Sequence, residues 1–528
     1  MLSSAANYGR ILRGVGRYLR LPPAADPAAV VRERFERREG DFVATVERVV
    51  FENPRNPYHA LLRAARCTFG DFSASVGRHG IEATLRSLHR AGVYLTHDEF
   101  KGRTPIVRPG GLEIHAAPER FANPSAALLM ETTSSGSSGA PTRTPKGLER
   151  TRYGDAIHAL LAREHDLDGR AHVELKTILP GATGLYAVLR RARERRRLAW
   201  FCAGGSWRRD GHYRLATHAA VLLARSRGCP APFPVFLAKG DFTPAARWLA
   251  ERRREGLACS ASGMTSAVTR VAAAALDHGL DISGATFQCG GEALTDTKRA
   301  LMARAGVTPV IGYHISELGA IGHACRRMAD GNRVHHYSES TAIVSHRRRV
   351  PLADVEVDSL LFTTLLPFAP LVLINVEMDD AARVGPSRCE CTLARAGWTT
   401  EIRDIFSFGK LTGQGMTLVG SDILHVLESA LPARFGGHPG DFQLVEREGA
   451  HQTEMDLLVS PRLGAAPHDV HAAFLAEVRK RQYGLQAERI WTQSQALRVV
   501  MAEPVPTRTG KVHPLRLLGA ARESARAS

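Results

Sequence analysis

A run of hydroxyl side chains and glycines over residues 132–141 contains the residue types best suited to chemistry in this sequence. It follows the apolar segment 126–130, which predicts a buried strand. Glycine lets a ligand approach the backbone closely, so several N–H groups and hydroxyls converge on a polyphosphate. A flexible linker is the alternative, because Gly/Ser tracts are usually linkers. The centre of the run consists of Ser134, Ser135, Gly136, Ser137, Ser138 and Gly139.

A glycine pair, Gly290 and Gly291, lies between an apolar run and a segment that predicts a helix over 295–305. Two glycines at the exit of a strand let a planar ring lie against the backbone. Cys289 and Glu292 flank the pair. An ordinary turn is the alternative, because most glycine pairs form turns.

The segment 310–317 combines an aromatic ring with a carboxylate. Tyr313, at the end of a predicted strand, is placed to stack on a nucleobase. Glu317, four residues later, offers the oxygen ligand that Mg²⁺ prefers when phosphates supply its other ligands. The alternative is a strand that ends at a helix capped by Ser316.

These motifs, in this order, resemble those of the adenylate-forming enzymes, and most closely those of the phenylacetate-CoA ligase branch. The phosphate loop of that family runs Ser/Thr-Ser/Thr-Gly-Ser/Thr-Ser/Thr-Gly-x-Pro-Lys. The segment 134–142 matches it with Thr142 in place of lysine, as tends to occur in that branch. The segment 288–294 is similar to the Gly-Gly/Ala-Glu-Pro/Ala-Leu segment that lines the adenine pocket. The segment 313–317 is similar to Tyr-Gly-x-Ser/Thr-Glu, with His314 at the usual glycine.

Two further segments extend the resemblance towards the C-terminus. The segment 361–380 resembles the stretch that ends Arg-Tyr-x-Thr-Gly-Asp, whose last aspartate binds the ribose hydroxyls. Asp380 is its match, with Asp379 at the usual glycine, and a surface β-turn is the alternative. The segment 504–512 resembles the Pro-x-Thr-x-x-Gly-Lys-Ile/Val loop. Its lysine, matched by Lys511, neutralises charge as a carboxylate attacks the α-phosphorus.

The resemblance implies a ligase that uses ATP and Mg²⁺ to convert a small carboxylic acid into acyl-AMP and pyrophosphate, and then acylates a thiol of CoA or of a carrier protein. An amine acceptor and a non-catalytic nucleotide-binding protein are the alternatives. The implied residues are Ser134 to Gly139 for the phosphates; Gly290, Gly291, Glu292, Tyr313, Ser316 and Asp380 for the nucleotide; Glu317 for the metal; Lys511 and Glu317 for catalysis; and His314 and Cys289 for the acyl pocket.

The composition is that of a folded protein with a basic surface. The chain has 528 residues, 44% of them hydrophobic and 23% charged, with a formal net charge of +17, and this length predicts two or three domains. Aromatic residues barely interleave with the arginine clusters and no nucleic-acid motif is present, so no nucleic-acid partner is predicted.

The longest apolar stretch, 360–376, is interrupted by Pro367 and Pro370, and residues 1–23 lack a long apolar core. We therefore expect a cytoplasmic protein without integral membrane contact.

The eight cysteines do not form a disulfide framework in a chain of this length. Cys389 and Cys391 have the spacing of half a zinc site, and Cys325 and the His335–His336 pair are available elsewhere in the sequence. No second pair with ligand spacing lies nearby. A loop with free thiols is therefore the alternative.

Residues before 120 are predicted to be helical. From 155 to 290, apolar strands such as 234–238 and 257–260 alternate with helices over 243–255 and 266–278, which predicts an α/β core with parallel strands. From 334 to 384 the pattern is rich in β-structure. With the resemblance, this predicts a large α/β domain over 1–402, including a helical extension and a β-rich part, and a smaller, mobile α+β domain over 403–528.

Overall fold

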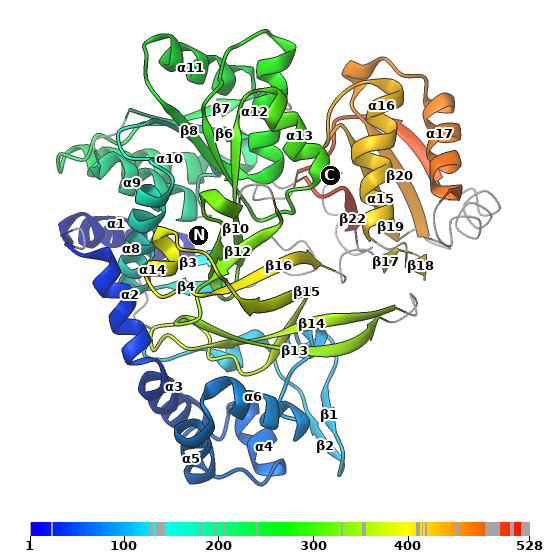
Figure 1. Ribbon diagram of the computed structural model, residues 1–528. Coiled ribbons are helices and arrows are strands. Elements are labelled where there is room, and N and C mark those ends of the chain that lie inside the picture. The colour runs from blue at the N-terminus through cyan, green and yellow to red at the C-terminus, as the bar shows by residue number, and fades with distance from the viewer. Residues whose placement is uncertain are drawn as a thin grey trace.

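The computed structural model describes residues 2–22, 25–126, 130–133, 143–179, 182–194, 197–203, 207–238, 241–328, 331–350, 355–407, 412–413, 416–417, 420–448, 453–480, 497–506 and 512–518. A large body of helices and strands lies beside a smaller C-terminal unit (Figure 1). Within the described ranges, no helix has the length and apolar character needed to cross a bilayer.

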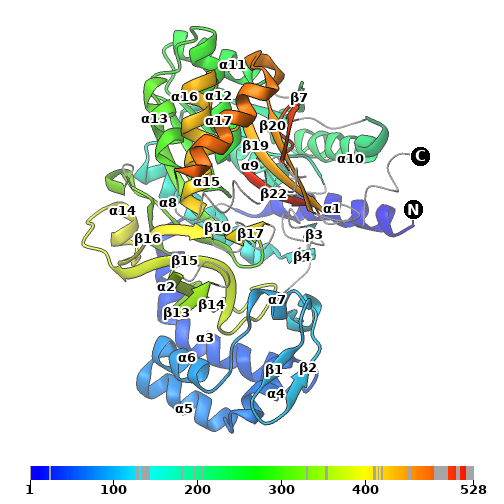
Figure 2. The same ribbon diagram turned by 90° about the vertical axis from the view of Figure 1, so that its right-hand side faces the viewer.

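The N-terminal part is helical, as predicted, up to a short β-hairpin. Asn56 caps α4 by accepting a hydrogen bond from the N–H of Tyr58, and Pro57 takes the first helical position. Figure 2 shows α3 to α6 gathered with the hairpin β1–β2 in one lobe. The elements are α1 (Leu2–Arg20), α2 (Pro27–Glu36), α3 (Arg38–Val46), the π-helical η1 (Glu47–Phe51), α4 (Pro57–Ala64), α5 (Phe69–His79), α6 (Ile81–Arg90), α7 (His97–Phe100), β1 (Ile106–Arg108), β2 (Leu112–Ile114) and the 3₁₀ turn η2 (Pro118–Phe121).

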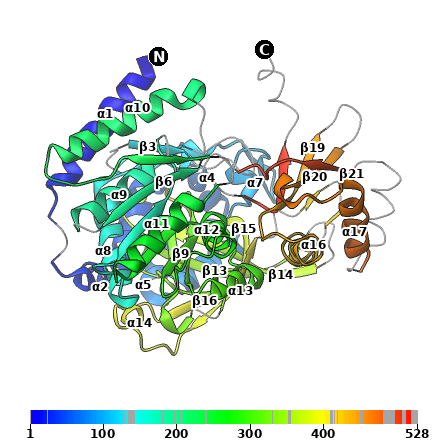
Figure 3. The same cartoon turned by 90° about the horizontal axis from the view of Figure 1, so that it is seen from above.

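Parallel strands and connecting helices form the middle of the chain, which confirms the predicted α/β core. The strands β5 (Ala171–Leu175), β6 (Leu198–Ala203), β7 (Pro234–Leu237), β8 (Cys259–Met264), β9 (Thr286–Gly290) and β10 (Thr308–Ile315) lie in the order β7-β6-β5-β8-β9-β10. The helices are α8 (Leu148–Glu164), α9 (Ala182–Arg193), α10 (Trp207–Arg225), α11 (Thr243–Arg254), α12 (Thr265–Asp277) and α13 (Asp296–Arg304). Seen from above, α10 lies alongside α1 (Figure 3).

The β-rich region extends the same sheet in antiparallel fashion, so that the described part of the chain contains one sheet of 12 strands. From β10 the order continues β11-β12-β16-β15-β14-β13. The 3₁₀ turn η3 (Arg326–Met328) and the helix α14 (Thr392–Arg395) lie in its connections. Its strands are β11 (Gly319–His323), β12 (Arg333–His336), β13 (Thr341–Val350), β14 (Val355–Thr364), β15 (Val376–Pro386) and β16 (Thr400–Ser407). Because β10 pairs in parallel with β9 and antiparallel with β11, it joins the two halves.

The C-terminal unit has a hydrophobic core of its own, built from residues such as Leu427, Leu457 and Phe474. Its main sheet has the order β21-β20-β19-β22. The proposed domain boundary after residue 402 falls inside β16, and the division remains a proposal. The elements are β17 (Thr412–Gly413), β18 (Met416–Thr417), α15 (Gly420–His425), the π-helical η4 (Val426–Ala430), α16 (Leu431–Phe435), β19 (Phe442–Glu448), β20 (Thr453–Val459), the 3₁₀ turn η5 (Pro461–Leu463), α17 (Pro467–Arg479), β21 (Leu497–Met501) and β22 (Leu515–Leu518).

A small hairpin brackets the hydroxyl-rich run. Its strands β3 (Met130–Thr133) and β4 (Arg143–Lys146) pair antiparallel, with Thr133 opposite Arg143. Thr132 and Thr133 therefore belong to a strand and not to the loop in which the sequence placed them. The run 134–142 itself lies outside the described residues.

Candidate functional site

Two residues that the sequence assigns to a nucleotide meet in the structure. The hydroxyl of Tyr313, near the end of β10, donates a 2.6 Å hydrogen bond to Oδ2 of Asp380 on β15. Burial and the neighbouring carboxylate raise the pKa of Tyr313 well above its usual value, so the phenol stays protonated as a donor. The hydrogen bond holds Asp380 at one fixed orientation beside the end of β10.

A β-bulge shapes the end of β10. The register with β11 shifts between Tyr313 and His314, and bulges re-aim side chains where they occur. The imidazole of His314 lies over Gly290, where an added Cβ would lie 3.5 Å from Nδ1 of His314. Three of the predicted residues, Gly290, Tyr313 and His314, therefore lie together at the ends of two neighbouring strands.

We expect Tyr313→Phe to weaken ATP binding by about three- to tenfold, since one neutral hydrogen bond contributes about 0.5–1.5 kcal/mol. The ring is retained, so any stacking is unchanged while Asp380 loses the donor that orients it. Isothermal titration with ATP measures the change. Tyr186→Phe is the matched control, because the Tyr186 hydroxyl is buried without a hydrogen-bond partner in the separate core around α1 and α9. Equal affinity of wild type and Tyr313→Phe would contradict a role for this pair.

Glu317 lies in the turn between β10 and β11 and is 6% exposed. Its Oε1 is 2.6 Å from Nζ of Lys101, a residue 216 positions away that the sequence did not assign to the site. No helix follows Ser316, which is an exposed residue of the same turn, so the helix-cap interpretation was wrong. Gly319 closes the turn with a φ of 101°, a conformation that favours glycine.

The Glu317 carboxylate is placed to bind a cation, because it already pairs with the ammonium group of Lys101. Mg²⁺ typically takes one or two protein carboxylates and completes its coordination with phosphate oxygens and water. Glu317 would serve as the carboxylate, and Lys101 would have to share it or turn to the phosphates. Lysine is rare in this arginine-rich sequence. This rarity is a feature that could have identified Lys101 as a site residue.

We expect Glu317→Gln to raise the Mg²⁺ concentration needed for half-maximal turnover by about tenfold, because the amide keeps the shape but not the charge that holds a cation. Glu356→Gln is the matched control, since Glu356 forms an exposed pair with Arg347. The variant Lys101→Met separates loss of the ion pair from loss of the metal ligand, because it leaves the carboxylate in place. An unchanged Mg²⁺ dependence in Glu317→Gln would make Glu317 a structural partner of Lys101 alone.

The short helix α7 and the residue after it, Lys101, bring two ionisable side chains to the site. Thr96 and Glu99 form a capping box that fixes the start of α7. Nδ1 of His97 is then 2.8 Å from Oδ2 of Asp379, the neighbour of Asp380. Asp379 has a φ of 59°, a conformation that glycine adopts most easily and aspartate tolerates. Asp379 therefore adopts a glycine-like conformation and pairs with His97.

The glycine-pair segment is tied to the helix α12 and to the C-terminal unit. Oε2 of Glu292 accepts a 2.7 Å hydrogen bond from the N–H of Ser266, at the start of α12. The Ser266 hydroxyl lies 3.3 Å from the N–H of Val512, which donates to it. Val512 directly follows Lys511, which lies outside the described residues together with Ser134 to Gly139. The chain next to the predicted catalytic lysine is therefore docked beside Glu292.

The C-terminal unit contacts the large body through a buried ion pair. Nζ of Lys298 on α13 is 2.7 Å from Oε1 of Glu428 on η4, and both side chains are at most 4% exposed. Burial opposes the charge of Lys298, but the carboxylates of Glu428 and Glu292 together outweigh it and raise the pKa of the lysine. The hydroxyls of Thr297 and Ser429 meet at 2.6 Å beside the pair.

A largely buried polar row crosses the carboxyl-terminal part of the parallel strands, near the sheet edge where α/β proteins bind ligands. Glu174, Ser262 and Gln288 are cross-strand neighbours. Lys176 and Arg191 lie 3.0 and 3.5 Å from the Glu174 carboxylate. Although burial opposes its ionisation, these cations hold the pKa of Glu174 well below its usual value. Sequence patterns did not reveal this row, because its members come from separate strands and a helix.

Cys289 does not share a face with the polar row. It alternates with Gln288 along β9 and packs in the main hydrophobic core. Burial raises the pKa of its thiol to about 12, so it stays neutral. A place for Cys289 in an acyl pocket remains a prediction.

Comparison with known proteins yields no matching family model and no matching curated protein. Solved structures similar to this fold include the anthranilate CoA ligase AuaEII in complex with anthranoyl-AMP, with a TM-score of 0.39 and 11% identity over 81% of this chain and 74% of that chain. The O-succinylbenzoate CoA synthetase MenE of Bacillus subtilis, in complex with ATP and magnesium ion, has a TM-score of 0.39 and 10% identity over 74% and 69%. VinN in complex with L-aspartate has a TM-score of 0.31 and 13% identity over 52% of this chain, which spans 60% of VinN. At these scores the likeness assigns no residue and no activity to this chain.

Proposed function

We propose that the protein activates a small carboxylic acid with ATP, forming acyl-AMP and pyrophosphate, and then transfers the acyl group to a thiol of CoA or of a carrier protein. The phenylacetate-CoA ligase branch is the proposed relative, on the basis of Thr142. The observation that carries the proposal is the 2.6 Å hydrogen bond between Tyr313 and Asp380. It brings together two motifs that the resemblance assigns to one nucleotide.

Each residue of the proposed site has a proposed task. Asp380 would accept hydrogen bonds from ribose hydroxyls, and the base would lie against the backbone of the glycine pair, Gly290 and Gly291, beside the His314 imidazole. Glu317 would hold Mg²⁺, which when bound offsets the negative charge of the phosphates. The loop from Ser134 to Gly139 would bind those phosphates with N–H and hydroxyl groups.

Lys511 would supply the cation that stabilises charge as the carboxylate attacks the α-phosphorus. The hydrogen bond from the N–H of Val512 to Ser266 supports this, because it docks the adjoining residue beside Glu292. The acyl-transfer step would follow a movement of the C-terminal unit that withdraws Lys511. An amine is the alternative acceptor.

The ion pair between Lys101 and Glu317 favours a second candidate, a non-catalytic nucleotide-binding protein. In that case the carboxylate that should hold Mg²⁺ is permanently neutralised by Lys101. ATP would then bind without activation of any acid.

ATP–pyrophosphate exchange with purified protein, Mg²⁺ and a panel of aryl, fatty, hydroxy and amino acids tests the proposal. We expect at least one acid to support exchange well above the acid-free rate. ATP binding without exchange for any acid would favour the non-catalytic candidate. Absence of both would overturn the nucleotide site itself.

A further inference from the structure

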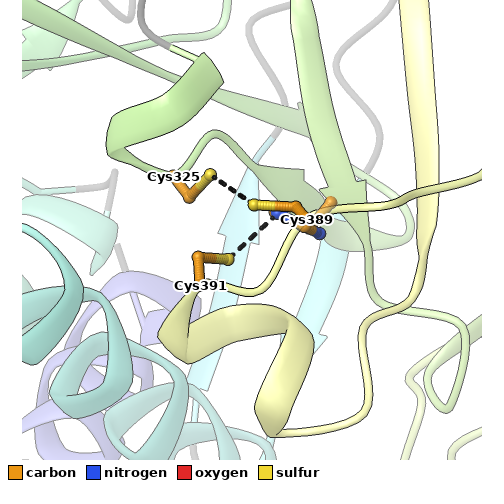
Figure 4. A group of neighbouring side chains, drawn as sticks. Cys325, Cys389 and Cys391 are labelled. Carbon is orange, nitrogen blue, oxygen red and sulfur yellow. Dashed lines mark hydrogen bonds between the residues drawn. The ribbon is translucent and has the colours of Figure 1, made fainter.

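Four side chains with metal-binding atoms lie close together beside the antiparallel half of the sheet. Cys325 follows β11, His335 lies in β12, and Cys389 and Cys391 lie in the connection from β15 to α14. One ligand atom from each lies within 4.8 Å of the others. Figure 4 shows the sulfur atoms of the three cysteines turned towards one another.

The shortest distances between these atoms are close to those expected for ligands of one ion. The Sγ atoms of Cys325 and Cys389 are 3.6 Å apart, and Sγ of Cys391 is 3.2 Å from Nε2 of His335. Around tetrahedral zinc, with bonds of about 2.3 Å to sulfur and about 2.0 Å to nitrogen, neighbouring ligand atoms are about 3.5–3.8 Å apart. A disulfide would instead require about 2.05 Å between the sulfur atoms.

His335 is held in the orientation and tautomer of a metal ligand. Its Nδ1 lies 2.8 Å from the carbonyl oxygen of Trp398. A carbonyl only accepts, so Nδ1 carries the hydrogen and donates it. The lone pair of Nε2 therefore faces the cysteines. A hydrogen bond from the remote ring nitrogen to a carbonyl or carboxylate is the usual support of a histidine that binds zinc.

The surrounding backbone holds the cysteine segments together. The Glu164 carboxylate accepts hydrogen bonds from the N–H of Arg326 at 3.2 Å and of Thr392 at 2.8 Å. These residues directly follow Cys325 and Cys391, so one carboxylate ties both segments. The N–H of Ala394 also donates to Sγ of Cys391 at 3.4 Å, which helps to fix the position of this sulfur atom.

We propose that Cys325, His335, Cys389 and Cys391 bind one Zn²⁺ ion in a structural site, separate from the proposed nucleotide site. Three soft sulfur ligands and one imidazole select zinc over Mg²⁺. Three thiols release their protons to solvent as three sulfur–zinc bonds and one nitrogen–zinc bond form, with no change of oxidation state. Four protein ligands leave no open position for a substrate, so the ion holds structure. It would clamp the connections around β11, β12 and α14.

Metal analysis of the purified full-length protein, prepared with reductant and without chelator, tests this site. We expect about one zinc per chain, released when a mercurial reagent titrates the thiols. Replacement by Co²⁺ should give strong sulfur-to-cobalt charge-transfer absorption and the visible bands of tetrahedral cobalt. Absence of zinc, with no uptake of Zn²⁺ or Co²⁺ by the reduced protein, would overturn the site. So would a disulfide between Cys325 and Cys389 in non-reducing peptide maps that persists at intracellular reductant levels.

Cys389→Ser is the most suitable variant, because Cys389 is less buried than the other three ligands. We expect it to lose most of its zinc and to unfold at a lower temperature than the wild type. Cys67→Ser, at a half-buried free cysteine outside the cluster, should keep its zinc. Full zinc content in Cys389→Ser would exclude that ligand and overturn the four-ligand site. If the variant does not fold, the cobalt spectrum of the wild type decides whether these side chains bind a metal ion.

Discussion

Lys511→Ala is expected to slow acyl-AMP formation by about a hundredfold or more, because loss of a fixed cation at a developing charge costs about 3 kcal/mol. ATP binding should be nearly unchanged, since Asp380 and the other proposed nucleotide-binding residues of β9 and β10 lie in the large body. Transfer from chemically supplied acyl-AMP should also be spared, because the lysine is proposed to act only in the first step. Single-turnover measurements of the two half-reactions separate these effects.

Lys480→Ala is a matched control for this variant. Lys480 is an exposed lysine at the end of α17 in the same C-terminal unit and pairs only with its helical neighbour Glu477 among the described contacts. It should leave both half-reactions unchanged. Equal losses in both half-reactions of Lys511→Ala would indicate a folding defect. No loss in either would remove Lys511 from the site.

Glu428→Gln is expected to destabilise the docking of the C-terminal unit by about 3 kcal/mol, because removal of one partner leaves a buried charge on Lys298. The amide still accepts from the Thr295 hydroxyl, which lies 2.6 Å from Oε2 of Glu428, so charge is the main change. We expect easier proteolysis between the two units and a slower adenylation step. Acyl transfer should be less affected, since it is proposed to follow undocking.

The double variant Lys298→Met/Glu428→Leu provides the control for the buried pair. Replacing both charges by apolar groups of similar size is often neutral or stabilising. Proteolytic resistance should therefore return, and a double-mutant cycle gives the coupling energy. If Glu428→Gln resisted proteolysis as well as the wild type, the pair would contribute nothing to docking.

The local pattern of the sequence was enough to predict individual elements, because helices and strands depend on nearby residues. The helix predicted over 243–255 is α11, and the strand over 234–238 is β7. The strand predicted over 257–260 was placed early, since β8 begins at Cys259 and continues to Met264. Apolar residues alone do not mark where a buried strand ends, so boundaries were less accurate than element types.

Contacts between residues that are far apart in the sequence could not be predicted from local patterns. The resemblance indicated Glu317, but its pairing with Lys101 depends on how α7 packs against the sheet. The four candidate zinc ligands showed only one recognisable spacing, Cys389 and Cys391. Cys325 and His335 join them because β11 and β12 are neighbours, which sequence spacing does not reveal.

The position of β16 between β12 and β15 has a consequence for synthesis of the chain on the ribosome. The strands β13, β14 and β15 reach the rest of the sheet only through β16 among the described pairings, although β16 is the last of these strands to be made. Until residues 400–407 emerge, β15 pairs with β14 and contacts α7, but no strand connects it to the half of the sheet that holds Tyr313. The parallel half is able to form earlier, since domains generally fold as their segments emerge. A nascent chain arrested before residue 400 should therefore contain a protease-resistant parallel half and no ATP affinity.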